Sequence, residues 1–320
     1  MSENVLREAQ NSLEVVGHVK KINLEEKTSK AGKDFIVGDV QIEVKEDDKI
    51  NVIKAKVFSN KFKKNGEISG LYKGYKTVQE EYNVGDKVRV SGDLRLEEYY
   101  TQNGSLTSFN SVNAVFFNRV NEEDDMREKA IATVEMVVES IEHKMDAEGL
   151  PTEYMEVEAF TVGYNGRIIP MRNLVIEEKL GEQFKSMYYP GTTGRITLKI
   201  NNYAEVETEE LEEAPTTGFG STERVESNIV TNYVNNLEII GGDLPFDDGV
   251  NEYSPADIEQ AHKNRALALQ QLKADNQASA EPTGFGSAEA KKEALKDALE
   301  GKNVPESERV SVSDDELPDF

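Results

Sequence analysis

The sequence contains no cysteine among its 320 residues. Without thiols the chain can form no disulfide, no zinc–thiolate centre and no cysteine nucleophile, and such a composition is typical of a reducing compartment. No apolar run approaches the roughly 20 residues that a membrane-spanning helix needs, and residues 1–4 lack the basic start of a signal peptide. We therefore expect a cytoplasmic protein that does not enter a membrane.

Residue types suited to catalysis are also scarce. His18, His143 and His262 lie far apart in the sequence, and each is expected to be a solvated or packed side chain. Acidic runs such as residues 209–213 lack the spaced ligands of a calcium site or a two-metal site. The chain has neither a Gly-Lys-Ser/Thr phosphate loop nor a dinucleotide fingerprint. The sequence therefore argues against an enzyme, and we expect neither a metal nor a cofactor.

The charge of the chain is distributed unevenly. The net charge is -24, yet residues 1–120 carry 19 basic and 18 acidic residues, and residues 54–95 carry 10 basic and 5 acidic residues. The excess of acidic residues therefore lies beyond residue 120. Such asymmetry predicts a polyanion-binding module joined to a region that mimics or repels polyanions.

Five segments of alternating apolar and polar residues occupy the first third of the chain. They cover residues 13–24, 34–44, 51–58, 87–96 and 109–119. Clusters of Gly and Asn separate them, and a longer excursion at 60–82 lies between the third and the fourth. This order predicts a small Greek-key barrel of the OB type over residues 1–121.

A second set of segments repeats the same order. Strands are expected at 130–142, 154–162, 167–171, 195–200 and 229–240, with a helix at 175–188 between the third and the fourth. The pattern predicts a second OB-like module over residues 129–241, which carries an acidic loop at 205–227.

Beyond residue 241 the chain changes character. Ser254 followed by Pro255 predicts the start of a helix over 255–274, and a shorter helix is expected at 288–299 before an acidic tail. Residues 242–320 have too few large apolar residues for a core of their own and are expected to be a flexible linker with these helices. The predicted fold class is therefore mainly β, with two OB-like Greek-key barrels in tandem followed by a flexible helical and acidic region.

Alternation along the first five strands gathers cationic and aromatic side chains on one outer face of the first barrel. Cations follow phosphates, and aromatic rings stack on bases without reading sequence. On the strands, the residues predicted to bind single-stranded nucleic acid are Phe35, Lys54, Lys56, Phe58, Arg89, Arg95 and Tyr99. The excursion adds Lys61, Phe62, Lys63, Lys64, Tyr72 and Tyr75, which could close over a bound strand. For each aromatic residue, packing against the core is the alternative.

Residues 82–95 contain a Gly-Asp turn, a Val-x-Val strand, a glycine kink and a Leu-Arg pair. This segment resembles the fourth strand of bacterial single-stranded-DNA-binding proteins. The final residues resemble their acidic tip, with a Leu in place of an Ile and one Asp inserted before the Phe; they are Asp314, Asp315, Glu316, Leu317, Pro318, Asp319 and Phe320. An ordinary acidic terminus is the alternative. The family uses Trp at key stacking positions, whereas this chain has no Trp.

The resemblance implies a protein, of the kind found in tailed bacteriophages, that coats single-stranded DNA during replication, recombination and repair. Its partners would be single-stranded DNA and the replication or recombination enzymes recruited by the tail, in the host cytoplasm if the protein is viral. The sequence leaves open whether the chain forms a homo-oligomer. A protein-interaction scaffold built on OB barrels, or a DNA mimic that binds no DNA itself, is the alternative.

Overall fold

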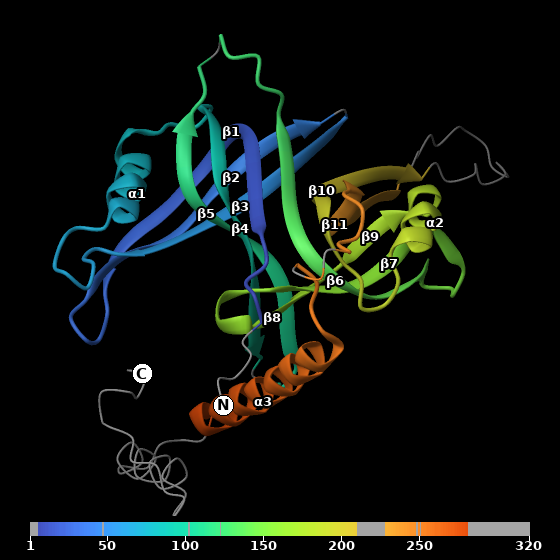
Figure 1. Ribbon diagram of the computed structural model, residues 1–320. Helices are drawn as coiled ribbons and strands as arrows, with labels where there is room; N and C mark the ends of the chain where they lie inside the picture. Colours follow the sequence, from blue (N-terminus) through green and yellow to red (C-terminus); the bar gives the residue numbers. More distant parts are fainter. Residues whose placement is uncertain are drawn as a thin grey trace, which may run out of the picture. The chain divides into compact units, whose positions relative to one another are not determined.

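The computed structural model describes residues 6–46, 48–101, 103–121, 123–209, 228–247, 249 and 251–280. Eleven strands and three α-helices are formed in this part of the chain (Figure 1). Most of the predicted acidic loop at 205–227 lies outside the described residues. The predicted helix at 288–299 and the acidic tail at 314–320 lie outside them entirely.

The first barrel is built from β1 (Asn11–Thr28), β2 (Asp34–Glu46), β3 (Lys49–Asn60), β4 (Lys87–Tyr100) and β5 (Leu106–Arg119), with α1 (Gly70–Glu81) between β3 and β4. Its strands are hydrogen-bonded in the order β1-β2-β3-β5-β4, and β4 returns to β1. The β3–β5 pair is parallel. This closed ring has the connectivity of an OB barrel. The predicted mainly β, OB-like fold is therefore confirmed.

The second barrel repeats this topology. Its elements are β6 (Lys129–Met145), β7 (Pro151–Val162), the 3-10 turn η1 (Tyr164–Gly166), β8 (Ile168–Met171), β9 (Leu174–Glu177), α2 (Glu178–Met187), β10 (Thr193–Glu209) and β11 (Asn228–Gly242). The closed ring runs β6-β7-β9-β11-β10 and back to β6, and β9 is parallel to β11.

The third strand of this barrel differs from the prediction. The segment expected in that role, now β8, pairs only with the edge of β7. The barrel strand is β9, which the sequence placed inside a helix beginning at residue 175. Val175 and Ile176 pair with β11 on one side and β7 on the other, which agrees with the strand preference of β-branched residues, and α2 begins at Glu178.

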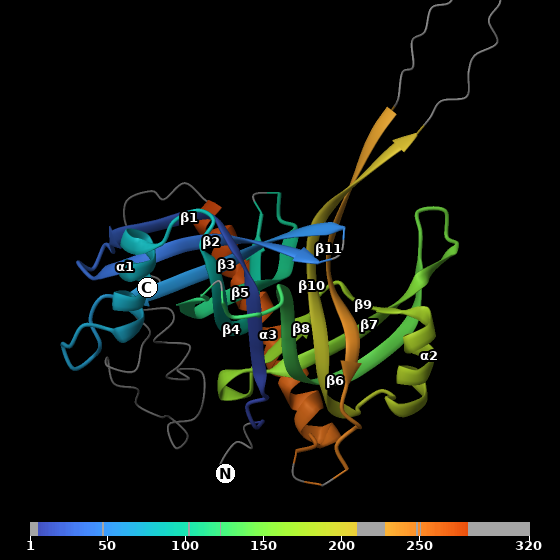
Figure 2. The same cartoon turned by 90° about the horizontal axis from the view of Figure 1, so that it is seen from above.

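The two barrels are joined through their first strands. Residues Asn11–Val16 of β1 pair with β6 on one side, while Leu13–His18 pair with β4 on the other. One continuous sheet of eleven strands results, and both barrels branch from it (Figure 2). In this shared stretch the consecutive residues Val15 and Val16 are both fully buried.

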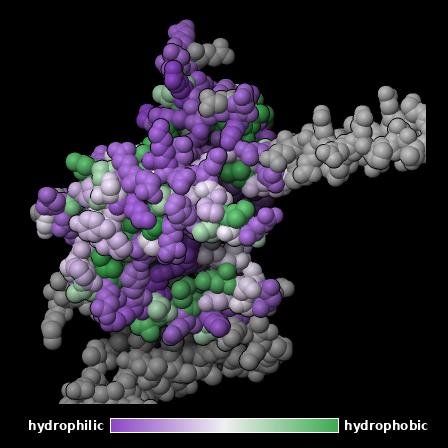
Figure 3. Space-filling model, turned by 90° about the vertical axis from the view of Figure 1, so that its right-hand side faces the viewer, coloured by the Kyte–Doolittle hydropathy of each residue, from purple (hydrophilic) through white to green (hydrophobic). Residues whose placement is uncertain are grey.

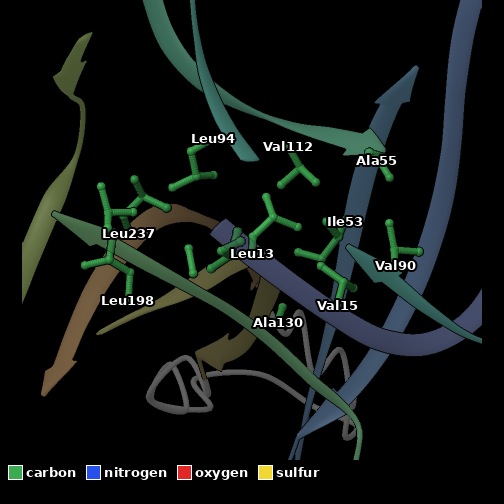
Figure 4. Packing of buried hydrophobic residues seen from close by; sticks show 14 of the residues in the cluster. Leu13, Val15, Ile53, Ala55, Val90, Leu94, Val112, Ala130, Leu198 and Leu237 are labelled. Atoms are coloured by element: carbon green, nitrogen blue, oxygen red, sulfur yellow. The ribbon is translucent and has the colours of Figure 1, made fainter. Parts of the chain in front are cut away.

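Apolar side chains from both barrels form one cluster, part of which is shown in Figure 4. Leu13 and Val15 of β1 lie in this cluster together with Ile53 of the first barrel and Leu198 of the second. Close backbone approach at the predicted kink in β4 explains Gly92, because a Cβ there would lie 1.9 Å from the carbonyl oxygen of Asn113.

Polar groups complete the contact between the barrels. Asn51 of β3 is 1% exposed, and its Oδ1 accepts a hydrogen bond of 2.7 Å from the backbone N–H of Asn202 in β10. The amide of Asn202 donates to the carbonyl of Val52 at 3.0 Å. Elsewhere, the N–H of Arg172 donates to Oδ1 of Asn110 in β5 at 2.6 Å. These bonds satisfy partly buried backbone groups that would otherwise lack a hydrogen-bond partner at the contact.

The helix after the barrels is longer than predicted and runs from Pro255 to Ala280 (α3). Ser254 is its N-cap: the Oγ accepts a hydrogen bond of 3.2 Å from the N–H of Asp257. In its first turns Ile258 and Ala261 pack on Phe160 of β7 in a second apolar cluster. This part of the C-terminal region therefore needs no core of its own, because it uses the surface of the second barrel.

The chain divides into two compact units. The first comprises residues 1–99 and 106–267 and contains both barrels; the second comprises residues 100–105 and 268–320. In the second unit, the N–H of Thr101 donates to the carbonyl of Ser105 across the β4–β5 turn at 2.9 Å. The division into separate modules at 1–121 and 129–241 stays a prediction.

Glu135 of β6 is a buried carboxylate that holds three segments together. Its Oε2 accepts hydrogen bonds from Arg7 at 2.9 Å and from the N–H of Gln10 at 3.0 Å, and Arg195 of β10 lies 3.7 Å away. Burial opposes ionisation, but these donors and positive charges outweigh it and hold the pKa of Glu135 below its ordinary value of 4.5.

A carboxyl with a depressed pKa in the folded state stabilises the fold above its unfolded pKa, and this stabilisation disappears as the pH falls through the folded value. We therefore expect the free energy of unfolding to fall below about pH 4.5, and Glu135→Gln to flatten that dependence. At pH 7 the substitution should cost about 1–3 kcal/mol, the usual loss for a hydrogen-bonded charge. Urea unfolding across pH 3–7 measures both effects. Glu153→Gln, at an exposed position of β7, is the control, and identical curves for the two variants would contradict the assignment.

Candidate nucleic-acid interface

Cross-strand pairing places several predicted binding residues side by side on the outside of the first barrel. Val37 of β2 lies opposite Phe58 of β3, and Gln41 lies opposite Lys54. β1 adds a third strand to these cross-strand pairs, because Lys21 lies opposite Gln41 and Lys27 lies opposite Phe35. The alternate residues of β2 and β3 are buried in the core, so this set points outwards. We call it the basic–aromatic face: Lys21, Lys27, Phe35, Lys54, Lys56 and Phe58.

Two phenyl rings form the aromatic part of this face. The ring centroids of Phe35 and Phe58 are 5.6 Å apart and the rings are tilted by 41°. Phe58 is 54% exposed, whereas Phe35 is half-buried. A large apolar ring that remains exposed beside a second one is a surface on which a flat, apolar partner can stack.

The lysines of the face differ in how far their charge is neutralised. Lys56 binds Glu97 of β4 at 2.6 Å and lies 5.4 Å from the ring centre of Phe109. Burial raises the pKa of Glu97, but hydrogen bonds from Lys56 and Ser111 bring it below its ordinary value. Lys21 and Lys54 are exposed, and neither forms an ion pair with any residue that the structure describes. These two are therefore the cations most available to an anionic ligand.

The loop after β3 continues the face at one end. The N–H of Lys61 donates to the carbonyl of Asp34 at 2.9 Å, and its side chain pairs with the same aspartate at 3.1 Å. This contact brings the loop next to Phe35. Phe62 is 51% exposed, and Lys63 and Lys64 are exposed. Their predicted role in binding stays a prediction.

The predicted residues of β4 fall into two groups. Arg95 and Tyr99 flank Glu97, the partner of Lys56, so they continue the face across β5; Arg95 pairs with Asp93 at 3.3 Å, and Tyr99 is 49% exposed. Arg89 lies apart from the face. It pairs with Glu14 of β1 at the junction with β6, where Lys129 binds the same carboxylate.

Tyr72 and Tyr75 do not lie on the surface, which corrects their assignment as stacking residues. They are 6% and 3% exposed, and the hydroxyl of Tyr75 donates to the carbonyl of Ala114 at 2.7 Å. Tyr72 bonds to Glu26 through its hydroxyl. The excursion folds as α1, whose inner face joins the barrel core. A signal was present: Leu71, Tyr72, Tyr75 and Val78 recur at the spacing of one helix face.

Comparison with known proteins places the chain in a family. The family model described as YorF matches residues 9–275. The chain belongs to the YorF family. No curated protein matches the chain.

Solved structures similar to this YorF-family chain include proteins named as single-stranded DNA-binding proteins. A deletion mutant from Thermus aquaticus has a TM-score of 0.46 at 11% identity and covers 78% of this chain and 98% of its own. The wild-type Thermus aquaticus protein has a TM-score of 0.44 at 11% identity, with coverages of 75% and 95%. A small protein from Streptomyces coelicolor has a TM-score of 0.24 at 14% identity, with coverages of 34% and 93%. The resemblance to bacteriophage proteins stays a prediction.

The second barrel of this YorF-family chain carries different chemistry at the positions equivalent to the basic–aromatic face. On the outside of this barrel, Ser140 of β6 lies opposite Glu158 of β7, and Glu142 lies opposite Glu156. Glu156 in turn lies opposite Val175 of β9, and Tyr154 lies opposite Glu177. The third strand of the first barrel carries Lys54, Lys56 and Phe58 on its outside, whereas in β9, the third strand of the second barrel, only Glu177 is exposed. The two equivalent surfaces therefore have opposite charge.

The described residues contain no group of three or more side chains placed to hold a metal ion. Each histidine faces a carboxylate: His18 faces Glu128 at 3.2 Å, His143 faces Glu178 at 3.8 Å, and His262 faces Glu139 at 3.0 Å. No described helix combines the length and the apolar character needed to cross a membrane.

Two residues of the basic–aromatic face, Lys21 and Lys27, were missed by sequence reasoning. The register of β1 shifts between Val19 and Lys21, so the alternation of that strand changes phase at Lys20. Two adjacent lysines within a strand of alternating pattern are the signal that could have revealed this bulge.

The core position of Tyr75 gives a test of the corrected assignment. Tyr75→Phe should lower the free energy of unfolding by about 0.5–1.5 kcal/mol, because it leaves the carbonyl of Ala114 without its donor. Tyr99→Phe, at an exposed ring on β4, should change it by much less. Chemical denaturation measures both, and equal effects would place Tyr75 on the surface after all.

Proposed function

We propose that this protein binds single-stranded DNA, without strong sequence preference, on the basic–aromatic face of its first barrel. The observation that carries the proposal is the Phe35–Phe58 ring pair, on the same outer face as Lys21 and Lys54, two lysines that form no ion pair with any described residue. Only a ligand with both flat rings and repeated negative charge uses the two components together. A single strand has unstacked bases and a phosphate at every nucleotide, whereas a duplex hides its bases.

The chemistry of the face supports binding that tolerates any sequence. Lysines contact phosphates and displace counterions, a term that does not depend on the base. Phenyl rings offer no hydrogen-bond donor or acceptor, so stacking on Phe58 distinguishes bases weakly. The cations act locally, because the net charge of -24 repels DNA from the molecule as a whole.

The finer role follows the predicted features of the tail. In this proposal the protein coats exposed strands during replication, recombination or repair, and Asp314–Phe320 recruits a partner enzyme. Acidic residues attract a basic pocket, and Leu317, Pro318 and Phe320 supply the apolar contact that charge lacks. The opposing proposal, an OB-barrel scaffold or DNA mimic, requires no binding of DNA by the chain itself.

Titration of the full chain with labelled oligo-dT, with duplex DNA as comparison, tests the proposal. We expect binding of the oligonucleotide that weakens as salt rises and is absent with duplex. Phe58→Ala should weaken binding by about 1–3 kcal/mol, with the salt dependence unchanged, because it removes one stacking surface. Phe116→Ala, at a ring that is 59% exposed outside the face, is the matched control. No binding of oligo-dT at low salt would overturn the proposal in favour of the scaffold.

The cations of the face give an independent measurement. The double variant Lys21→Ala with Lys54→Ala should reduce the slope of log affinity against log salt by about 0.7 for each phosphate that a lysine no longer neutralises. Lys179 and Lys185 are exposed on α2, and changing both to Ala removes the same charge outside the face. Equal changes of slope in the two double variants would show that the face has been assigned wrongly.

The tail is tested by separating charge from apolar contact. Deletion of residues 313–320 should tighten DNA binding, most at low salt, because these carboxylates compete with phosphates for the lysines. It should also abolish capture of the recruited enzyme. Phe320→Ala keeps the charge, so DNA affinity should stay constant while capture is abolished. A pull-down in which Phe320→Ala retains every partner of the intact chain would make the tail an ordinary acidic terminus.

A further inference from the structure

A cleft of about 440 Å³ lies on the second barrel. One wall is the outer surface of β7 and β9, including Tyr154 and Glu156; the other is the hairpin of β10 and β11, which carries Tyr203 and Tyr233. These walls meet because β9 pairs with β7 on one edge and β11 on the other (Figure 2). The cleft thus occupies the position on the second barrel that the basic–aromatic face occupies on the first.

Aromatic rings line the cleft and are open to solvent. Tyr233 is 83% exposed and Tyr154 is 37% exposed. The surface of the molecule viewed from the side of the second barrel is mainly hydrophilic, with apolar residues in small, separate groups (Figure 3). Exposed tyrosines on such a surface suit a partner that is polar but has a weakly hydrated face.

The cleft already holds one cation from its own chain. Nζ of Lys49, the first residue of β3, lies 4.5 Å from the ring centre of Tyr203 and 2.7 Å from its hydroxyl. The same ammonium pairs with Glu205 at 3.0 Å. Hydrogen bonds to Tyr203 and Glu205 raise the pKa of Lys49 above its ordinary value. A tyrosine ring with a carboxylate beside it therefore already binds a cation in this molecule.

Tyr154 and Glu156 place a second tyrosine and a second carboxylate in the same cleft. Glu156 is exposed and forms no ion pair with any described residue, and it lines the cleft with Tyr154 and Tyr233. Glu142 lies opposite Glu156 on the same outer surface, and Glu158 follows on β7. Lys144 is the remaining basic residue of the lining. The lining itself is balanced, with Lys49 and Lys144 against Glu156 and Glu205. The excess of carboxylates lies on the neighbouring outer surface, at Glu142 and Glu158, where it opposes a phosphate backbone and attracts a cation.

We infer that this cleft binds a cationic side chain of a basic protein partner, with Tyr154 and Tyr233 as the aromatic walls and Glu156 as the counter-charge. Arginine fits better than lysine, because its planar guanidinium can stack on a tyrosine ring and direct two N–H groups at a carboxylate. The site is independent of the basic–aromatic face, so one chain can hold DNA and a basic protein at once.

Fluorescence anisotropy of a labelled hexa-arginine peptide on the full chain at about 150 mM salt, near physiological ionic strength, tests the inference. Tyr233→Ala should weaken peptide binding by about fivefold to tenfold, the effect of removing one good cation–π interaction. Glu156→Gln should weaken it to a similar extent. The affinity for oligo-dT should stay unchanged in both variants, which separates a failure of this site from a failure of the proposed DNA-binding function.

Matched controls distinguish the cleft from general attraction to an acidic protein. Glu182→Gln removes the same charge from an exposed position on α2, and Tyr189→Ala removes a tyrosine that is 68% exposed in the turn before β10. Neither should weaken peptide binding. If Glu182→Gln weakens it as much as Glu156→Gln does, the attraction is not local and the inference is overturned. If Tyr233→Ala weakens oligo-dT instead of the peptide, the cleft is a nucleic-acid site and the inference is equally overturned.

Discussion

The pairing of β1 with β6 is the constraint on which the rest of the structure depends. An OB barrel leaves part of its first strand as an exposed edge, and such an edge invites unwanted pairing. Here Asn11–Val16 of β1 and Lys129–Val134 of β6 cover each other. Polar contacts such as Asn51 with Asn202 add hydrogen bonds between the two barrels. The two barrels consequently present their second and third strands as separate, fixed outer surfaces.

These surfaces have diverged in chemistry while keeping the same backbone. In the first barrel, outer positions of the third strand hold Lys54, Lys56 and Phe58. In the second barrel the equivalent strand, β9, ends at Glu177 and forms a cleft with the β10–β11 hairpin. The repeated framework thus carries the surface that we propose binds an anion and the cleft that we infer binds a cation. The net charge of the whole chain argues against DNA binding. The charge of each surface, considered separately, removes this objection, because the basic–aromatic face carries lysines.

Much of this could be predicted from the sequence because strand alternation and turn residues are local signals. The five strands of the first barrel, the Gly92 kink and the Ser254 cap are examples. The predictions were wrong where contacts between residues far apart in the sequence determine the local structure. Val175 and Ile176 extend because β7 and β11 flank them. Tyr75 is buried because α1 closes the barrel, and Lys56 is neutralised because Glu97 comes from another strand.

The bulge at Lys20 divides β1 into two lengths with opposite phase. Before it, odd-numbered residues such as Leu13 and Val15 face the core; after it, the even-numbered Leu24 does, and Lys21 is turned outwards. One extra residue therefore separates the side-chain alternation at the junction of the barrels from the alternation on the basic–aromatic face. Mutations that improve packing at the junction leave the orientation of the lysines unchanged. The junction and the basic–aromatic face can therefore evolve independently, although both use the same strand.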